Sequence, residues 1–468
     1  MNPAQVVVIG GGISGVSAAL AVRRQAPPGT AITIVEQTDR LGGKIRTGEV
    51  AGHRVESGAE TFIVRAPEAA GLAAELKLPL IHPAPGGASV WIGGTLRSLP
   101  GGTMMGVPGD PATVAGVLPA EAAAAVEAEP ANPSDEPLLA AGDDVSVGAL
   151  VRSRLPGEVV DRLVDPLLGG VYAGRADGLS VRVTVPALAA AAEKSHSLVA
   201  AAKLAAGSGG TRTTGPVFGT VDGGLSELVE SAARESGAKV RYGLPVRELR
   251  RTATGWQLVI GSTRHPELLD ADAVVLAVPA APAARLLSGV SGAAAEIATV
   301  DYASMALVTL ALPRLELPAG SGFLVSTDAG LVIKAATFMS QKWGFPDAGE
   351  LAIVRASVGR FGDTEVLRRD DADLVALVRH DLETVIGRSL PQSIDTRVTR
   401  WGGGLPQYAP GHLALVSRVR ATIEDFDTLA VAGAAYDGVG IPACVRSGTA
   451  AGARVSLALG KEQESDHG

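Results

Sequence analysis

The sequence is poor in several residue types, and each shortage excludes a class of protein. Cys444 is the single cysteine in 468 residues, which excludes an internal disulfide and a cysteine metal site. The seven histidines are scattered, and no two share a helical or strand spacing that would bring them to one metal ion. We therefore predict no metal site.

Long apolar runs are also missing. No uninterrupted apolar stretch reaches the roughly 18 residues that span a bilayer, although the mean hydropathy is +0.25. The apolar start is interrupted by glycines and lacks a basic leader, so we expect a cytoplasmic protein without a transmembrane segment. A net charge of −8 argues against general nucleic-acid binding, which requires a basic face.

Aromatic residues make up only 3% of the chain, whereas small and aliphatic residues are abundant. The predicted core is therefore aliphatic and closely spaced. At 468 residues the chain exceeds the roughly 250 to 300 residues at which a single core stops growing. Two or three domains are expected.

A buried-strand pattern over residues 6–9 runs into a Gly-x-Gly-x-x-Gly turn at Gly10, Gly12 and Gly15. Gly10 lets the chain turn sharply, Gly12 lets the backbone approach a pyrophosphate, and Gly15 lets the next helix pack against the strand. A second strand pattern over residues 32–35 ends at Glu36, whose carboxylate is expected to accept hydrogen bonds from an adenosine ribose. This order of elements predicts a dinucleotide site, with Gly10, Gly11, Gly12, Ile13, Ser14, Gly15 and Glu36 at the cofactor.

A second glycine-rich run follows Glu36 closely. In Arg40-Leu-Gly-Gly-Lys-Ile-Arg-Thr47, paired glycines stand between cations, which suits a loop laid against a pyrophosphate and a ribose. The run resembles the second FAD motif of the amine oxidase and protoporphyrinogen oxidase superfamily, with Lys44 at a position where arginine is common. The resemblance implies FAD as the cofactor, bound also by Arg40, Gly42, Gly43, Lys44, Ser57, Gly58, Ala59 and Glu60.

A third glycine turn lies near the other end of the chain. Residues 429–433 are typical of a short buried strand, and residues 436–448 lead to a helix of small residues that is expected to begin at Thr449. A glycine turn at a helix N-terminus can bring backbone N–H groups against a flavin. The run Gly-Val-Gly-Ile-Pro-Ala-Cys resembles the C-terminal flavin motif of the porphyrinogen oxidases, which implies flavin contacts at Gly433, Gly438, Val439, Gly440 and Ile441.

Motifs in the middle of the chain distinguish between branches of this superfamily. Residues 166–174, and residues 401–408 with His412, resemble the porphyrinogen oxidases rather than the amine oxidases. The loop 99–108 resembles that of the coproporphyrinogen branch of Gram-positive bacteria, whereas the mitochondrial branch carries an arginine near the position of Met104 or Met105. The resemblance, which extends from Val6 to about Val455, predicts an oxidase of haem biosynthesis that converts coproporphyrinogen III to coproporphyrin III, with dioxygen as acceptor and hydrogen peroxide as product.

Several alternatives stay open. The substrate could be protoporphyrinogen IX, or the chain could be a flavin amine or polyene oxidase, or a scaffold that binds flavin and a tetrapyrrole without oxidation. The resemblance also implies transient contact with the next enzyme of the haem pathway. Peripheral contact with a membrane is a further expectation, because the product is poorly soluble.

The resemblance implies an α/β fold with a discontinuous Rossmann-like FAD domain, a mixed-sheet substrate domain and a mainly helical insertion. We assign residues 1–82, 217–284 and 424–461 to the FAD domain, residues 83–104 and 285–423 to the substrate domain, and residues 105–216 to the insertion. Residues 118–144 are rich in alanine, glutamate and proline, and a mobile surface loop is expected there.

Further site residues are assigned only because they correspond to functional positions of the resembling family. The backbone at Val246 is implied to bind the adenine, and Trp401 is implied either to pack beside the flavin or to contact the substrate. The substrate residues are Gly170 near the pyrrole nitrogens, Leu324 on the macrocycle and Met105 in the cavity wall. No catalytic side chain is predicted, because the flavin carries the chemistry. Coproporphyrinogen carries propionates, and the candidate cations for them, with a solvated helical face as the alternative, are Arg175, Arg182, Lys194, Lys203 and Arg212.

Overall fold

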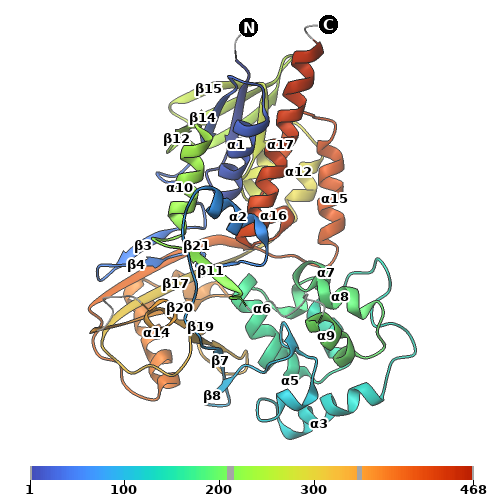
Figure 1. Ribbon diagram of the computed structural model, residues 1–468, viewed down its shortest axis with the longest axis vertical. Coiled ribbons are helices and arrows are strands. Elements are labelled where there is room, and N and C mark those ends of the chain that lie inside the picture. Colours follow the sequence, from blue (N-terminus) through green and yellow to red (C-terminus); the bar gives the residue numbers. More distant parts are fainter. Residues whose placement is uncertain (1–2, 208–214, 345–349, 466–468) are drawn as a thin grey trace.

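Two larger sheets and a group of helices make up most of the chain in the computed structural model, which describes residues 3–207, 215–344 and 350–465. Figure 1 shows a parallel sheet with its helices at one end of the molecule, together with both termini. The larger mixed sheet and the helical region lie side by side at the other end. The chain is therefore a mixed α/β protein, as the sequence predicts.

The first sheet is wholly parallel, with strand order β12-β2-β1-β16-β22. Along its central strand the side chains alternate between two cores, with Val6 and Val8 on one face and Val7 and Ile9 on the other. A strand buried on both faces requires the continuous apolar run that the sequence shows. The strands are β1 (Gln5–Ile9), β2 (Ala31–Val35), β12 (Lys239–Arg241), β16 (Ala273–Leu276) and β22 (Leu429–Val431).

Helices from both ends of the chain cover the Val6 face. Helix α1 (Ile13–Gln25) contacts α10 (Leu225–Ser236) and the C-terminal helix α17 (Ile441–Ser465), which lies along it in Figure 1. The predicted start of the last helix at Thr449 was wrong, because α17 begins at Ile441. Pro442 is compatible with this earlier start. Proline lacks a backbone N–H, and in the first helical turn that N–H would have no intrahelical acceptor.

The Val7 face is covered by a small antiparallel sheet and by helices. Strands β13 (Val246–Arg251), β14 (Trp256–Gly261) and β15 (Pro266–Ala271) form this sheet, and the buried Trp256 belongs to the core beneath it. Helices α11 (Ala280–Leu287), α12 (Ala293–Ile297) and α15 (His412–Ile423) complete the same core. Of the described helices, none is both long and apolar enough to cross a membrane.

The second large sheet has seven strands in the order β21-β17-β20-β19-β18-β7-β8, and all neighbours are antiparallel except β18 and β7. Helix α14 (Asp371–Ile386) packs on one face through Leu374, Val378 and Leu382. The strands are β7 (Ala88–Ile92), β8 (Thr95–Ser98), β17 (Tyr302–Pro313), β18 (Gly322–Val325), β19 (Ile333–Phe338), β20 (Leu351–Val358) and β21 (Asp395–Pro406).

The helical region has a core of its own, built from valine, leucine and alanine. Residues 118–144, expected as a mobile loop, contain the helix α3 (Ala120–Ala128), and Val126 and Leu139 are buried in this core. Part of that segment is therefore packed. The other helices are α4 (Val147–Arg152), α5 (Gly157–Val159), α6 (Asp165–Tyr172), α7 (Val181–Thr184), α8 (Pro186–Ala192) and α9 (Leu198–Gly207).

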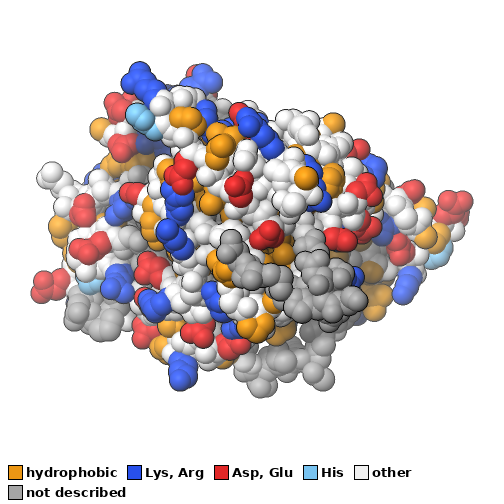
Figure 2. All heavy atoms as spheres, turned by 90° about the horizontal axis from the view of Figure 1, so that it is seen from above, with side chains coloured by type: hydrophobic (Ala, Val, Ile, Leu, Met, Phe, Trp, Pro, Cys, Tyr) orange, Lys and Arg blue, Asp and Glu red, His pale blue; other side chains and the backbone are white. Residues whose placement is uncertain are grey.

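Short elements connect these regions. They are β3 (Thr47–Val50), β4 (His53–Glu56), β5 (Phe62–Ile63), α2 (Pro67–Glu75), β6 (Leu80–Ile81), β9 (Thr103–Met104), β10 (Val107–Pro108), β11 (Phe218–Val221), α13 (Met339–Trp343) and α16 (Ala434–Asp437). On the face seen from above, Figure 2 shows basic and acidic side chains interspersed. The described residues of this face therefore form no extended basic area of the kind that binds nucleic acid.

Candidate functional site

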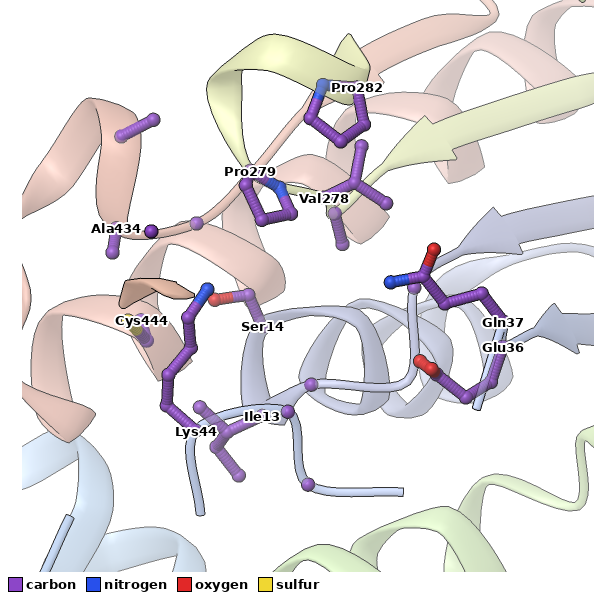
Figure 3. A pocket seen from close by; sticks show the side chains of 18 of the residues that line it. Ile13, Ser14, Glu36, Gln37, Lys44, Val278, Pro279, Pro282, Ala434 and Cys444 are labelled. Atoms are coloured by element: carbon purple, nitrogen blue, oxygen red, sulfur yellow. The ribbon is translucent and has the colours of Figure 1, made fainter. Parts of the chain in front are cut away.

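A cavity of about 380 Å³ lies at the carboxyl ends of β1, β2 and β16, where they meet the N-termini of α1 and α17. In open α/β sheets this edge is the place where ligands bind. Figure 3 shows Glu36 and Gln37 on one side of the cavity, Ser14, Lys44 and Cys444 on the other, and Pro279 and Pro282 across it. Residues from both ends of the chain therefore share one cavity.

The three glycines of the first turn have different surroundings. Gly10 has a φ of +103°, and a Cβ there would lie 2.4 Å from the carbonyl oxygen of Ala277. A Cβ on Gly15 would lie 2.0 Å from the carbonyl oxygen of Gly10. Gly12, by contrast, has a φ of −70° and caps α1, and among the described residues a Cβ there would meet only the Cα of Gly43, at 4.0 Å.

Gly10 and Gly15 are therefore required by the protein's own packing, whereas Gly12 is not. Its missing side chain leaves space in front of the α1 N-terminus, where free N–H groups and the helix dipole favour an anion. Gly12 and Gly43 both line the cavity and lie side by side in its wall, since a Cβ on Gly43 would be 3.2 Å from the Cα of Gly12. This cradle fits the pyrophosphate of a dinucleotide.

Glu36 is 8% exposed and lies at the end of β2. Its Oε2 accepts a hydrogen bond of 2.7 Å from the Gly11 backbone, and its Oε1 accepts bonds of 2.8 Å from the backbone N–H and the hydroxyl of Thr38. These donors fix the carboxylate at the cavity wall. Further lone pairs of the carboxylate can still accept hydrogen bonds from ribose hydroxyls.

The loop after Glu36 closes one wall of the cavity. The Arg40 guanidinium donates to the carbonyl oxygens of Leu41, Gly43 and Ile45 at 2.8–3.0 Å, so it holds the loop together. The Gly42 N–H donates to the Gly11 carbonyl at 2.8 Å, which joins this loop to the first turn. Lys44 lines the cavity, and the surrounding protein lowers its pKa by desolvation. Arg40 thus acts within the protein, whereas Lys44 can face an anionic ligand.

Residues 57–60 support the loop from behind. The Ser57 and Ala59 N–H groups donate to the carbonyl oxygens of Arg46 and Lys44 at 2.8 and 3.0 Å. A Cβ on Gly58 would lie 2.0 Å from the Lys44 carbonyl oxygen, so only glycine fits. Trp401 lines the cavity, and its indole N–H donates to the Ser57 carbonyl at 2.8 Å. Of residues 57–60, Ala59 reaches the cavity.

Glu60 lies in a buried ion-pair network. Its Oε1 accepts from Lys342 and from the Trp343 indole, each at 2.8 Å, and its Oε2 pairs with Arg355. Burial alone would raise the pKa of Glu60, but Arg355 and Lys342 outweigh it and lower that pKa to about 2. The carboxylate is paired with these partners, and Glu60 does not line the cavity. Glu60 thus braces the loop against α13 and β20.

We expect Glu60→Gln to lower the free energy of unfolding by about 3–5 kcal/mol, because it leaves Arg355 and Lys342 buried without their counter-charge. The contribution of Glu60 is present above the unfolded pKa of about 4.3 and is lost as the pH falls toward about 2. Urea unfolding at pH 7 and pH 3.5 measures both effects. The variant should lose less stability than the wild type between these two pH values, and equal losses would contradict the assignment.

The C-terminal turn forms the opposite wall. Gly433 and Gly438 have φ values of +122° and +114°, which favour glycine. Val439, Ile441 and Cys444 line the cavity around the start of α17. Burial raises the pKa of Cys444 to about 11, so its thiol is neutral near pH 7 and acts as a small packing group. The side chains of this wall are apolar, which suits the aromatic face of a flavin ring.

Several cavity residues had not been predicted. Pro279 and Pro282 follow β16, and the Ala280 N–H donates to the Tyr302 hydroxyl at 3.0 Å. Arg285 donates to the carbonyl oxygen of Val246 at 3.1 Å, which fixes that backbone at the cavity. The buried strand pattern ending near Pro279 could have indicated this wall. Arg285 and Tyr302 carry no local sequence signal.

Most of the predicted cofactor residues meet at this one cavity. Those that line it are Gly10, Gly12, Ile13, Ser14, Glu36, Arg40, Gly42, Gly43, Lys44, Ala59, Val246, Trp401, Gly433, Val439 and Ile441. Those that do not line it are Gly11, Gly15, Ser57, Gly58, Glu60, Gly438 and Gly440.

The predicted substrate residues lie outside this cavity. A Cβ on Gly170 of α6 would lie 3.5 Å from Cδ2 of Leu324, so α6 and β18 meet there. Leu324 and Met105 both pack at the edge of the helical core. Among the candidate cations, Arg182 pairs with Glu193 at 2.6 Å, and Arg212 falls outside the described residues.

Hydrogen bonds connect this second region to the cavity. Gln407 of the chain segment after β21 donates to the Tyr172 carbonyl at the end of α6, at 2.9 Å. Tyr172 packs edge-on against Tyr408 at 5.9 Å between ring centroids, and the Tyr408 hydroxyl donates to the carbonyl of Ala434, a cavity residue, at 2.5 Å. These contacts join the C-terminal end of α6 to the wall of the cavity at Ala434.

The chain is similar to known proteins along most of its length. The chain is 39% identical to a coproporphyrinogen III oxidase of Mycobacterium tuberculosis, covering 95% of this chain and 96% of that protein. It is 31% identical to a coproporphyrinogen III oxidase of Bacillus subtilis, with the same coverage. A crystal structure of an Exiguobacterium protein superposes with a TM-score of 0.87 at 31% identity, covering 98% of this chain and all of that one. Residues 13–456 match the family described as flavin containing amine oxidoreductase, and the chain belongs to that family.

Proposed function

We propose that the protein is a FAD-dependent oxidase that converts coproporphyrinogen III to coproporphyrin III. The observation that supports this most is that residues from both ends of the chain meet at one cavity at the carboxyl edge of the parallel sheet, in a chain similar along 95% of its length to coproporphyrinogen III oxidases. Coproporphyrinogen carries four carboxylates, so the proposal also requires cations near the contact between α6 and β18.

The residues around the cavity fit FAD in one orientation, with its adenosine near Glu36 and its ring near Gly433. Glu36 would hold the adenosine ribose, and the backbone around Gly12 and Gly43 would hold the pyrophosphate. The apolar wall made by Gly433, Val439 and Ile441 would hold the ring. Because Glu36 is negatively charged, a 2′-phosphate on the ribose would be repelled, which favours FAD over a phosphorylated nicotinamide dinucleotide.

When bound, FAD supplies two-electron oxidation, and we propose that three such rounds, each ending on dioxygen with release of hydrogen peroxide, remove the six electrons. The protein's part is to bind the substrate, to orient it and to exclude side reactions. Leu324 and Met105 offer apolar surface to a large ring. The backbone at Gly170 is the proposed contact for the pyrrole nitrogens. No side chain is assigned as a general base, because the pyrrole protons can leave to solvent.

Anaerobic reduction of the flavin by each porphyrinogen is the decisive measurement. We expect coproporphyrinogen III to bleach the flavin absorbance at least about tenfold faster than protoporphyrinogen IX, a difference of about 1.4 kcal/mol in the transition state. In air, the same substrate should yield three peroxide molecules for each porphyrin.

Other outcomes would overturn the proposal in distinct ways. Faster reduction by protoporphyrinogen IX would assign the chain to that substrate. Reduction by an amine and by neither porphyrinogen would make it an amine oxidase. Tight binding of a porphyrin without flavin reduction or peroxide would show a scaffold.

A further inference from the structure

A buried lysine lies behind the contact between α6 and β18. Lys334 of β19 is only 3% exposed, and its Nζ has no hydrogen-bond partner among the described residues. An ammonium group buried in this way costs several kcal/mol unless something pairs with it. Such a group needs an explanation, because buried lysines in proteins are almost always paired.

A second cation with unused donors lies close by. Arg360 follows β20, and its Nη1 is buried and has no hydrogen-bond partner in the described part of the chain. Its Nη2 makes one long contact, 3.4 Å to the Val325 carbonyl of β18. A Cβ on Gly169 would lie 3.6 Å from Nη1 of Arg360, which places the guanidinium against α6 next to Gly170.

An irregularity in the sheet turns Lys334 toward this place. The register of β19 against β20 shifts between Ile333, which pairs with Val358, and Ala335, which pairs with Ser357. Lys334 is therefore the extra residue of a β-bulge, a feature that redirects a side chain out of strict alternation. Ala335 pairs on its other side with Leu324, so the bulge lies one residue from the proposed substrate contact.

The charges around the two cations do not balance. Burial first, and the positive charge of Arg360 second, lower the pKa of Lys334 to about 7. Within the described residues, no carboxylate offsets the charge of Lys334. Asp165 and Asp363 lie near Arg360, but a third cation, Arg175, lies there as well. The Oδ1 of Asp165 accepts a hydrogen bond of 2.5 Å from the Ala176 N–H, and burial raises the pKa of Asp165. An anion would balance this cluster.

We propose that Lys334 and Arg360 together bind a propionate carboxylate of the tetrapyrrole where α6 meets β18. This inference rests on the proposed function and adds a specificity site to it. The ammonium and the unused guanidinium N–H groups are the donors that a carboxylate requires. The site also supplies the cationic contact that the Met104-Met105 loop cannot make.

Binding of coproporphyrin III, followed by its fluorescence, tests the site without turnover. Lys334→Met and Arg360→Gln should each raise the Kd about 10- to 100-fold, because each removes a charge-assisted hydrogen bond. With coproporphyrinogen III as substrate, KM should rise and kcat should change little. Lys334→Arg should recover most of the affinity. Lys239→Met, which changes an exposed lysine of β12 at the edge of the parallel sheet, should bind like the wild type.

Thermal unfolding separates a binding role from a structural one. If Lys334 serves a ligand, Lys334→Met should raise the Tm of the ligand-free holoenzyme by a few degrees, because it removes a buried amino group that has no hydrogen-bond partner among the described residues. A lower Tm together with unchanged porphyrin affinity would overturn the inference. The inference also fails if Lys334→Met does not fold and Arg360→Gln binds coproporphyrin III normally. A wild type that neither binds coproporphyrin III nor is reduced by coproporphyrinogen III would refute the proposed function instead.

Discussion

Replacing Gly12 by valine is expected to give a folded, colourless protein. The backbone of Gly12 has an extended conformation that any residue adopts, and a Cβ there meets no atom of the described residues closer than 4.0 Å. The valine side chain would therefore occupy the space proposed for the pyrophosphate without disturbing the turn. We expect FAD affinity to fall about 1000-fold or more, because roughly two hydrogen bonds to a charged group are lost. Flavin absorbance per protein after gel filtration measures the loss.

The controls for Gly12 come from the same turn and the same cavity. Gly15→Val should reduce the yield of folded protein, because its Cβ would clash with the carbonyl oxygen of Gly10. Cys444→Ser changes one atom of the opposite wall and should keep the yellow colour. Circular dichroism distinguishes an empty site from an unfolded chain. A yellow Gly12→Val protein would contradict the placement of the pyrophosphate.

The contrast between Gly12 and Gly15 shows how much of the site could be predicted from the sequence. A βαβ unit is local, so the order of apolar residues, glycines and Glu36 was enough to predict the strand, the turn and the helix. The sequence could not show which glycines serve packing and which leave space for a ligand. That distinction depends on Ala277 and Gly43, which lie on other elements.

The predictions that were incomplete concern residues whose partners lie far away in the sequence. Glu60 belongs to a motif that resembles a cofactor-binding one, yet its partners, Arg355 and Lys342, come from almost 300 residues further along. No periodicity in the sequence could indicate that pairing. The position of Lys334 could not be predicted either, because a β-bulge can be recognised only when two strands are aligned.

A second substitution with a large expected effect lies in the C-terminal helix α17. Gly448 was expected in the turn before the helix, but it lies inside α17, where a Cβ would be 2.0 Å from the carbonyl oxygen of Ser14. One turn later, a Cβ on Gly452 would be 2.4 Å from the carbonyl oxygen of Ala18. The two glycines therefore let α17 lie directly against α1. This contact connects the two ends of the chain.

Gly448→Val is expected to lower the free energy of unfolding by about 3 kcal/mol or more, because the clash is with backbone and cannot be relieved by a rotamer change. FAD retention should fall as well, since Ser14 and the start of α17 both line the cavity. Denaturant unfolding and flavin content measure the two effects. Gly460→Ala is the matched control in the same helix, where a Cβ meets no described residue within 4 Å. It should keep its flavin and gain about 0.5–1 kcal/mol from helix propensity. If Gly448→Val kept both its stability and its flavin, α17 would not be held against α1 as described.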